Sequence, residues 1–81
     1  MPTTYEEVRD RLSRKPLPTE LEATKVDAVM RELGYARHEG KGSHVLYRKP
    51  GAPTRTFAID RRRVGKAAVA ALAYYIQTEG R

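Results

Sequence analysis

Two histidines flank a glycine-rich turn, and basic side chains lie close to the second one: His38, Lys41, His44 and Arg48. A histidine can take or give a proton near neutral pH because its unperturbed pKa is about 6.5. RNA carries its own nucleophile, since a base that removes the 2′-hydroxyl proton lets that oxygen attack the adjacent phosphate. Nearby cations would stabilise the charge that develops on this phosphate. These residue types indicate RNA cleavage without a metal, although a histidine near a strand start is more often a structural residue.

The positive charge of the chain is concentrated in its middle. The net charge is +6, and residues 37–66 hold nine basic side chains against two acidic ones, while residues 1–36 hold six against seven. Such a local field attracts a polyanion, because each neutralised phosphate releases counterions. The alternative is a solvated face of an arginine-rich protein. We predict an RNA-backbone footprint consisting of Lys41, Arg48, Lys49, Arg55, Arg61, Arg62, Arg63 and Lys66.

Length and composition argue against several classes of protein. A chain of 81 residues forms one domain with a thin core, which leaves little room for a large cofactor cleft. The chain has no cysteine, and its two histidines lack the HxxxH spacing of helical metal sites, so we expect neither a metal nor a small-molecule cofactor. No apolar run approaches the ~20 residues of a membrane span, and the N-terminus is too polar for a signal peptide. We therefore expect a cytoplasmic protein without a membrane partner.

The N-terminal segment reads as a short amphipathic helix. Residues 4–7, Thr-Tyr-Glu-Glu, match the pattern of a capping box, in which a threonine hydroxyl and a glutamate carboxylate satisfy free N–H groups. Tyr5, Val8 and Leu12 then fall on one stripe, and Pro16 lies just beyond the predicted helix at residues 4–15. The chain is accordingly divided into an N-terminal helical extension, residues 1–19, and a main domain, residues 20–81.

A second helix is predicted from about Glu20 to Leu33. Residues 19–22 repeat the capping pattern, and apolar residues follow at three- and four-residue spacings. Gly34 is placed to stop this helix in the left-handed conformation. Residues 23–25 could divide it into two pieces.

From residue 35 the pattern changes to short runs of aromatic and β-branched residues separated by glycine and proline. These runs predict three strands, at residues 35–39, 43–49 and 54–59, followed by an alanine-rich helix at residues 64–77. The order predicts an α+β fold, in which helices cover one face of a three-stranded antiparallel sheet and the opposite face is open to a ligand.

Two registers are possible for the first hairpin. A three-residue turn would place His38 directly opposite His44, whereas a two-residue turn would place Glu39 there. Strand alternation puts His44 and Arg48 on the same side of the second strand in either case.

The sequence resembles the HicA family (also called HicA/YcfA), small mRNA interferase toxins of HicA-HicB toxin-antitoxin modules. Five pieces within residues 25–76 carry the resemblance: Met30–Tyr35 (MRELGY), Lys41–His44 (KGSH), Tyr47-Arg48, Pro50-Gly51 and Thr56–Ile59 (TFAI). The Gly-Ser-His element followed by Tyr-Arg, after a helix that ends in Leu-Gly-Tyr, is the most specific part.

The resemblance implies a fold like the double-stranded RNA-binding domain, with α-β-β-β-α order, preceded here by an additional N-terminal helix. It implies that His44 is the catalytic residue of a metal-independent endoribonuclease that cleaves mRNA. We add His38 as a second proton carrier and Lys41, Ser43 and Arg48 as further support. The implied partners are RNA and a HicB-like antitoxin protein that covers the site.

Two other interpretations keep the fold and change the function. A non-catalytic RNA-binding module would keep the basic face and bind RNA without cutting it. A structural or interaction domain would use the alanine-rich last helix as a partner surface, and its basic charge would be incidental.

Overall fold

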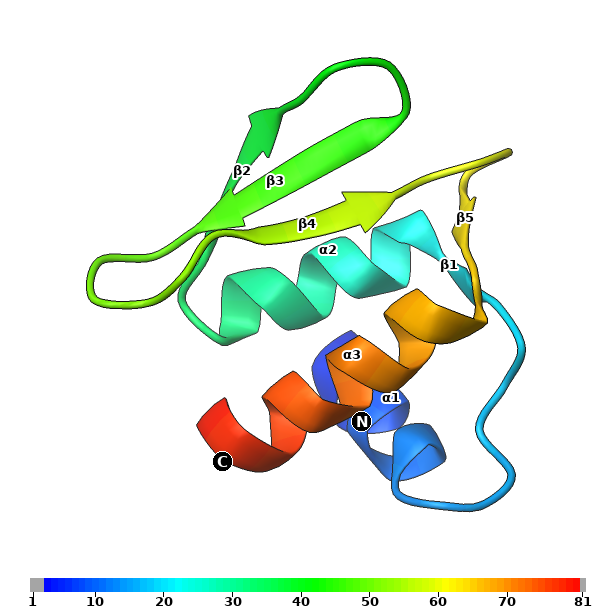
Figure 1. Ribbon diagram of the computed structural model, residues 1–81. Coiled ribbons are helices and arrows are strands. Elements are labelled where there is room, and N and C mark those ends of the chain that lie inside the picture. Colours follow the sequence, from blue (N-terminus) through cyan, green and yellow to red (C-terminus); the bar gives the residue numbers. More distant parts are fainter. Residues whose placement is uncertain (1–2, 81) are drawn as a thin grey trace.

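The computed structural model describes residues 3–80, which form three helices and five short strands (Figure 1). All three helices lie on one side of a three-stranded antiparallel sheet, in which β3 is central. This arrangement confirms the predicted α+β fold. The elements in chain order are α1 (Thr4–Leu12), β1 (Leu21–Glu22), α2 (Ala23–Glu32), β2 (Ala36–Glu39), β3 (His44–Arg48), β4 (Arg55–Ala58), β5 (Arg63–Val64) and α3 (Lys66–Glu79).

A capping box starts α1, one residue earlier than predicted. The Thr3 hydroxyl accepts a hydrogen bond from the Glu6 amide at 3.2 Å, and the Thr3 amide donates to the Glu6 carboxylate at 2.9 Å. The predicted stripe of Tyr5, Val8 and Leu12 is buried, as expected for an amphipathic helix. These three side chains belong to the same core cluster as residues of α2, the sheet and α3.

The start of α2 corrects the sequence prediction. Glu22 is the N-terminal cap and makes no side-chain capping bond, so residues 19–22 do not form a capping box. Leu21 and Glu22 instead pair with Val64 and Arg63 as a separate two-stranded sheet. Leu21 is buried in the core, and this pairing joins the segment before α2 to the segment before α3.

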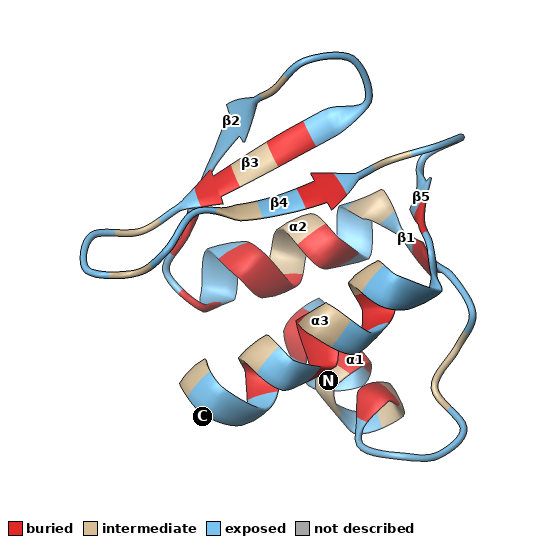
Figure 2. Ribbon diagram, in the orientation of Figure 1, coloured by how far each residue is buried: buried red, intermediate tan, exposed pale blue. Residues whose placement is uncertain are grey.

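The three predicted strands are present, with β2 one residue shorter at its start and β3 and β4 one residue shorter at each end. Val45, Tyr47 and Phe57 face the helices and are buried, and the Tyr47 and Phe57 rings meet edge to face at 5.8 Å. Phe57 also contacts Tyr75 of α3 in the same manner at 6.3 Å. The apolar alternation of β3 and β4 therefore attaches the sheet to the helices, and β2 is exposed along its length (Figure 2).

Gly34 ends the turn after α2 with a φ of +97°, the left-handed conformation predicted from the sequence. No helix within residues 3–80 is both long enough and apolar enough to cross a membrane.

Candidate functional site

The face of the three-stranded sheet that carries no helix is the candidate site. The register pairs Ala36 with Arg48, His38 with Leu46, Leu46 with Thr56, and His44 with Ala58. Directly paired residues share a face, and residues two apart along a strand also share it. We call this surface the open face, defined by Ala36, His38, His44, Leu46, Arg48, Thr56 and Ala58. All of these residues are exposed except Leu46, which is half-buried.

The register of the first hairpin differs from both predicted alternatives. Glu39 pairs with Val45, so Gly40 lies opposite His44, and the Gly40 amide donates to the His44 carbonyl at 3.0 Å. A Cβ on Gly40 would lie 2.9 Å from that carbonyl oxygen, so the close approach of the two backbones requires glycine. Neither His38 nor Glu39 is therefore directly opposite His44.

The turn also orients the imidazole of His44. Its Nδ1 lies 3.2 Å from the carbonyl oxygen of Lys41, whose backbone also accepts the His44 amide at 3.1 Å. A carbonyl oxygen can only accept, so this contact is a hydrogen bond in the tautomer that has its hydrogen on Nδ1, and that tautomer has its lone pair on Nε2. The exposed ring thus presents a basic nitrogen to solvent.

His38 and Arg48 occupy the same face at offset positions. His38 pairs with Leu46, which makes His44 and Arg48 its two diagonal neighbours on β3. In an antiparallel pair such neighbours lie about 7–8 Å apart. Two imidazoles and one guanidinium therefore line the open face, and none of the seven residues that define it is acidic. Ser43 is exposed just ahead of His44, and its carbonyl accepts the Ile59 amide at 2.9 Å.

The eight predicted RNA contacts divide into two groups. Lys49 and Arg55 bind Glu79 at 2.8 and 2.9 Å on the helical side of the sheet, and Arg63 binds Glu20 at 3.2 Å. The other five make no ion pair with any carboxylate of residues 3–80 and are exposed. These five, which we call the free cations, are Lys41, Arg48, Arg61, Arg62 and Lys66.

Glu79 is a structural residue that sequence reasoning missed. Its carboxylate accepts hydrogen bonds from Tyr35 at 2.7 Å, Lys49 at 2.8 Å and Arg55 at 2.9 Å. Burial raises the pKa of Glu79, but the hydrogen bonds from Lys49, Tyr35 and Arg55 outweigh it and hold the pKa below its ordinary value. These bonds fix the end of α3 to the sheet.

A second polar cluster joins α2 to the core side of the sheet. The Tyr47 hydroxyl donates to Asp27 at 2.9 Å, and Arg31 donates to the other carboxylate oxygen at 2.7 Å. Burial and the bond to Asp27 raise the pKa of the Tyr47 hydroxyl well above its usual range. Tyr47 is therefore a buried anchor of the sheet.

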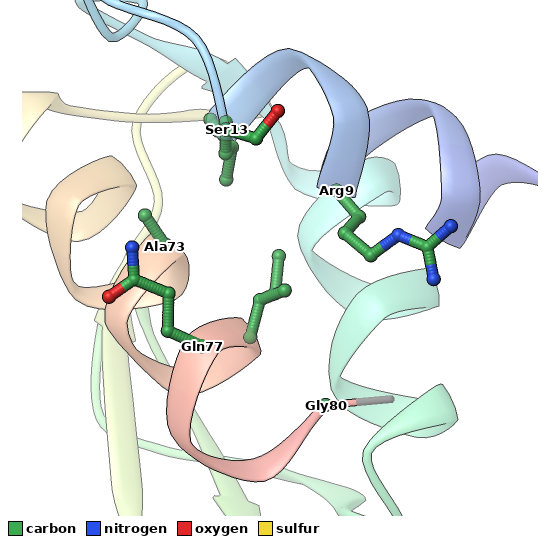
Figure 3. A pocket seen from close by; sticks show the side chains of 7 residues that line it. Arg9, Ser13, Ala73, Gln77 and Gly80 are labelled. Atoms are coloured by element: carbon green, nitrogen blue, oxygen red, sulfur yellow. The ribbon is translucent and has the colours of Figure 1, made fainter.

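A pocket of about 280 Å³ lies between α1 and α3, on the helical side of the molecule (Figure 3). It contains no histidine and none of the predicted site residues, and its lining is formed by Arg9, Leu12, Ser13, Ala73, Ile76, Gln77 and Gly80. Within the described part of the chain, no group of three or more His, Asp or Glu side chains is placed to hold a metal ion.

Comparison of the chain with protein-family models, with curated proteins and with solved structures finds no match.

Proposed function

We propose that this protein is a metal-independent endoribonuclease in which His44 acts on RNA bound across the open face. The observation that carries the proposal is the setting of His44. Its ring is exposed, its Nδ1 is engaged by the Lys41 carbonyl, and its Nε2 is free to accept a proton. An exposed base on a face without carboxylates suits an anionic substrate.

The reaction follows from the chemistry of RNA. His44 Nε2 takes the proton of a 2′-hydroxyl, and that oxygen attacks the adjacent phosphorus. The bond from phosphorus to the 5′-oxygen of the next nucleotide then breaks. The products are a 2′,3′-cyclic phosphate and a 5′-hydroxyl, so no electrons are gained or lost. Arg48 and Lys41 neutralise the charge that builds up on the phosphate oxygens.

His38 is the second proton carrier in this proposal. The departing 5′-oxygen needs a proton, and protonated His38 can deliver it across the open face, either directly or through one water molecule. His38 and His44 are diagonal neighbours on this face, and the separation of about 7–8 Å typical of such neighbours would let both residues reach one phosphate.

The sequence resemblance to the HicA family extends the proposal to the cell. In this extension the protein is the toxin of a type II toxin-antitoxin module, its substrate is mRNA, and a HicB-like antitoxin neutralises it by covering the open face. The site of action would be the cytoplasm, where mRNA is translated.

One observation favours a second candidate, a non-catalytic RNA-binding module. Gly40 and Ala58 are the direct cross-strand neighbours of His44, so neither a carboxylate nor a second histidine is directly opposite it. Such a site would bind RNA through the free cations and leave it intact.

The reaction class is tested with two matched oligonucleotides, one of RNA and one fully 2′-O-methylated, each incubated with the protein in excess EDTA. The proposal predicts that the RNA is cut to products with 2′,3′-cyclic phosphate ends and that the methylated strand, which lacks the nucleophile, is bound and left intact. Binding of both strands without cleavage would establish the non-catalytic module.

A further inference from the structure

The turn between β4 and β5 contains two arginines in a conformation that arginine seldom adopts. Asp60 and Arg63 exchange two backbone hydrogen bonds, each of 2.9 Å, so Arg61 and Arg62 form a two-residue hairpin loop. Their φ angles are +53° and +65°, and both therefore lie in the left-handed region. Paired positive φ values are typical of a type I′ turn, for which Asn-Gly is the favoured sequence.

The backbone of this turn bonds within the protein, since the Arg62 carbonyl accepts the Ala23 amide at 2.8 Å, but the two arginine side chains gain no ion pair for adopting the left-handed conformation. An arginine in the left-handed region suffers a clash between its Cβ and the following carbonyl that glycine avoids. Neither Arg61 nor Arg62 pairs with a carboxylate of residues 3–80, and both are exposed. Two left-handed arginines whose guanidiniums pair with no carboxylate of residues 3–80 point to an anionic ligand outside the protein.

The turn lies at the same end of the sheet as His44. Ile59, one residue ahead of the turn, donates its amide to Ser43, and Ala58 is paired with His44. Three residues of chain span at most about 10 Å, so the Cα of Arg61 lies within that distance of the Cα of Ala58. Figure 1 shows the β4–β5 turn and the β2–β3 turn projecting at this same end, away from the helices.

We infer that Arg61 and Arg62 form a phosphate clamp that holds the RNA backbone beside the phosphate placed at His44. This inference rests on the proposed function and names the part of the substrate that the turn recognises, which is two consecutive phosphates of a single strand. A guanidinium presents a planar fork of donors that matches phosphate oxygens. A single strand is the substrate, because in-line attack by a 2′-hydroxyl requires a nucleotide that can leave helical geometry.

If the clamp is present, one double substitution in the turn should raise the thermal stability of the protein and weaken its binding to RNA. Replacing the loop by the favoured sequence, Arg61→Asn with Arg62→Gly, relieves both left-handed arginines and removes both guanidiniums. The thermal midpoint of unfolding should rise by roughly 4–8 °C, the size of shift expected when a small domain no longer holds arginines in the left-handed conformation. Binding of an unstructured 2′-O-methyl RNA 12-mer should weaken at the same time.

The salt dependence of RNA affinity measures how many phosphate contacts the double variant has lost. Each contact to a single strand contributes about 0.7 to the slope of log affinity against log salt, so the double variant should lose about 1.4 from it. Between 50 and 200 mM salt the affinity of the parent should then fall roughly sevenfold more than that of the variant. The control variant, Arg14→Gln with Lys15→Gln, removes the same charge from the exposed segment that follows α1 and should keep the slope of the parent.

Three results separate this inference from the proposed function. If the loop variant binds the 12-mer with the affinity and slope of the parent, the clamp is wrong, whether or not the parent cleaves RNA. If the loop and control variants lose equal slope, the effect is one of net charge and the clamp is also wrong. If the parent binds the 12-mer but cuts no RNA, the proposed function fails, and the slope of the loop variant still decides on the clamp.

Discussion

His44 owes its chemical setting to its backbone neighbours. The Lys41 carbonyl selects the hydrogen-bearing nitrogen of the ring, and Gly40 lets the facing strand approach closely enough to bond the His44 carbonyl. The geometry of this turn is therefore part of the proposed catalytic apparatus.

Gly40→Ala tests this dependence. The added Cβ would lie 2.9 Å from the His44 carbonyl oxygen and 3.3 Å from its carbonyl carbon, so the two backbones must separate. We expect a loss of about 1–3 kcal/mol in the free energy of unfolding and a fall in RNA cleavage of roughly tenfold or more, measured by urea unfolding and by single-turnover kinetics. The matched control is Gly65→Ala, where a Cβ would meet no atom within 4 Å, and its cleavage rate should stay within about twofold of the parent. Equal losses in both variants would contradict the special role of Gly40.

The sequence proposed His44 and placed it on the same side of its strand as Arg48, but it did not indicate which side faces the core or what lies opposite His44. Side-chain alternation is a local property, and it places His44 and Arg48 together in every register. The register depends on a close backbone approach at Gly40, which a strand pattern does not reveal.

At the scale of elements, the alternation of side chains at the end of β3 places the neighbouring residues Arg48 and Lys49 on opposite faces of the sheet. Arg48 lies on the open face without an ion pair, whereas Lys49 points to the helical side, where it binds Glu79 and the Leu33 carbonyl at 3.0 Å. Both residues were predicted to contact the RNA backbone. The sequence did not reveal that Lys49 is paired, because its partner, Glu79, lies thirty residues away along the chain. A charge count cannot anticipate such a partner.

This separation predicts opposite phenotypes for Arg48→Gln and Lys49→Gln. The first should reduce the salt slope of RNA binding by about 0.7 and change the free energy of unfolding by less than about 0.5 kcal/mol. The second should destabilise the fold by about 1 kcal/mol, because it leaves part of the Glu79 charge uncompensated, and should keep the slope of the parent. Titrations of RNA binding and urea unfolding of both variants provide the measurement. A reversed pattern would mean that Lys49 rather than Arg48 contacts RNA.

The helix starts show where local patterns were ambiguous. Residues 3–6 and 4–7 both match a capping box, and only the extended backbone of Thr3 decides between them. The second match, at residues 19–22, was wrong because pairing of Leu21 with Val64 takes precedence over a cap. That strand pair joins segments more than forty residues apart, which no local pattern could indicate.

At the scale of the whole molecule, one core holds the helices and the sheet together. The α1 side chains Tyr5, Val8 and Leu12 share a core cluster with α2, the strands and α3. Apolar periodicity predicted the buried stripes of α1 and α2 correctly, because burial follows the apolar stripe of each of these helices, but in α3 it missed the buried Val69 and Ala73. The polar contacts that fasten its rim, at Glu79 and Asp27, depend on tertiary proximity and were not predicted.

Acid should weaken the molecule partly through Glu79. Because its pKa in the folded protein lies below the ordinary glutamate value of about 4.3, the ionised group stabilises the fold fully above that pH, and the contribution disappears as pH falls through the lowered pKa. Glu79→Gln should cost about 2 kcal/mol at pH 7 and much less at pH 3, measured by urea unfolding. The control Glu22→Gln breaks an exposed pair with Lys25 and should cost less than about 0.5 kcal/mol. A cost for Glu79→Gln that stays constant or grows on acidification would rule out this role.

The central claim, that His44 acts chemically on RNA bound across the open face, is tested most directly by His44→Ala. Single-turnover cleavage of an RNA oligonucleotide in EDTA should fall by roughly 10²–10⁴-fold, the usual contribution of a general base. The affinity for the 2′-O-methyl strand and the thermal midpoint should stay close to those of the parent, because the side chain is exposed. Cleavage by His44→Ala at the rate of the parent would contradict the claim.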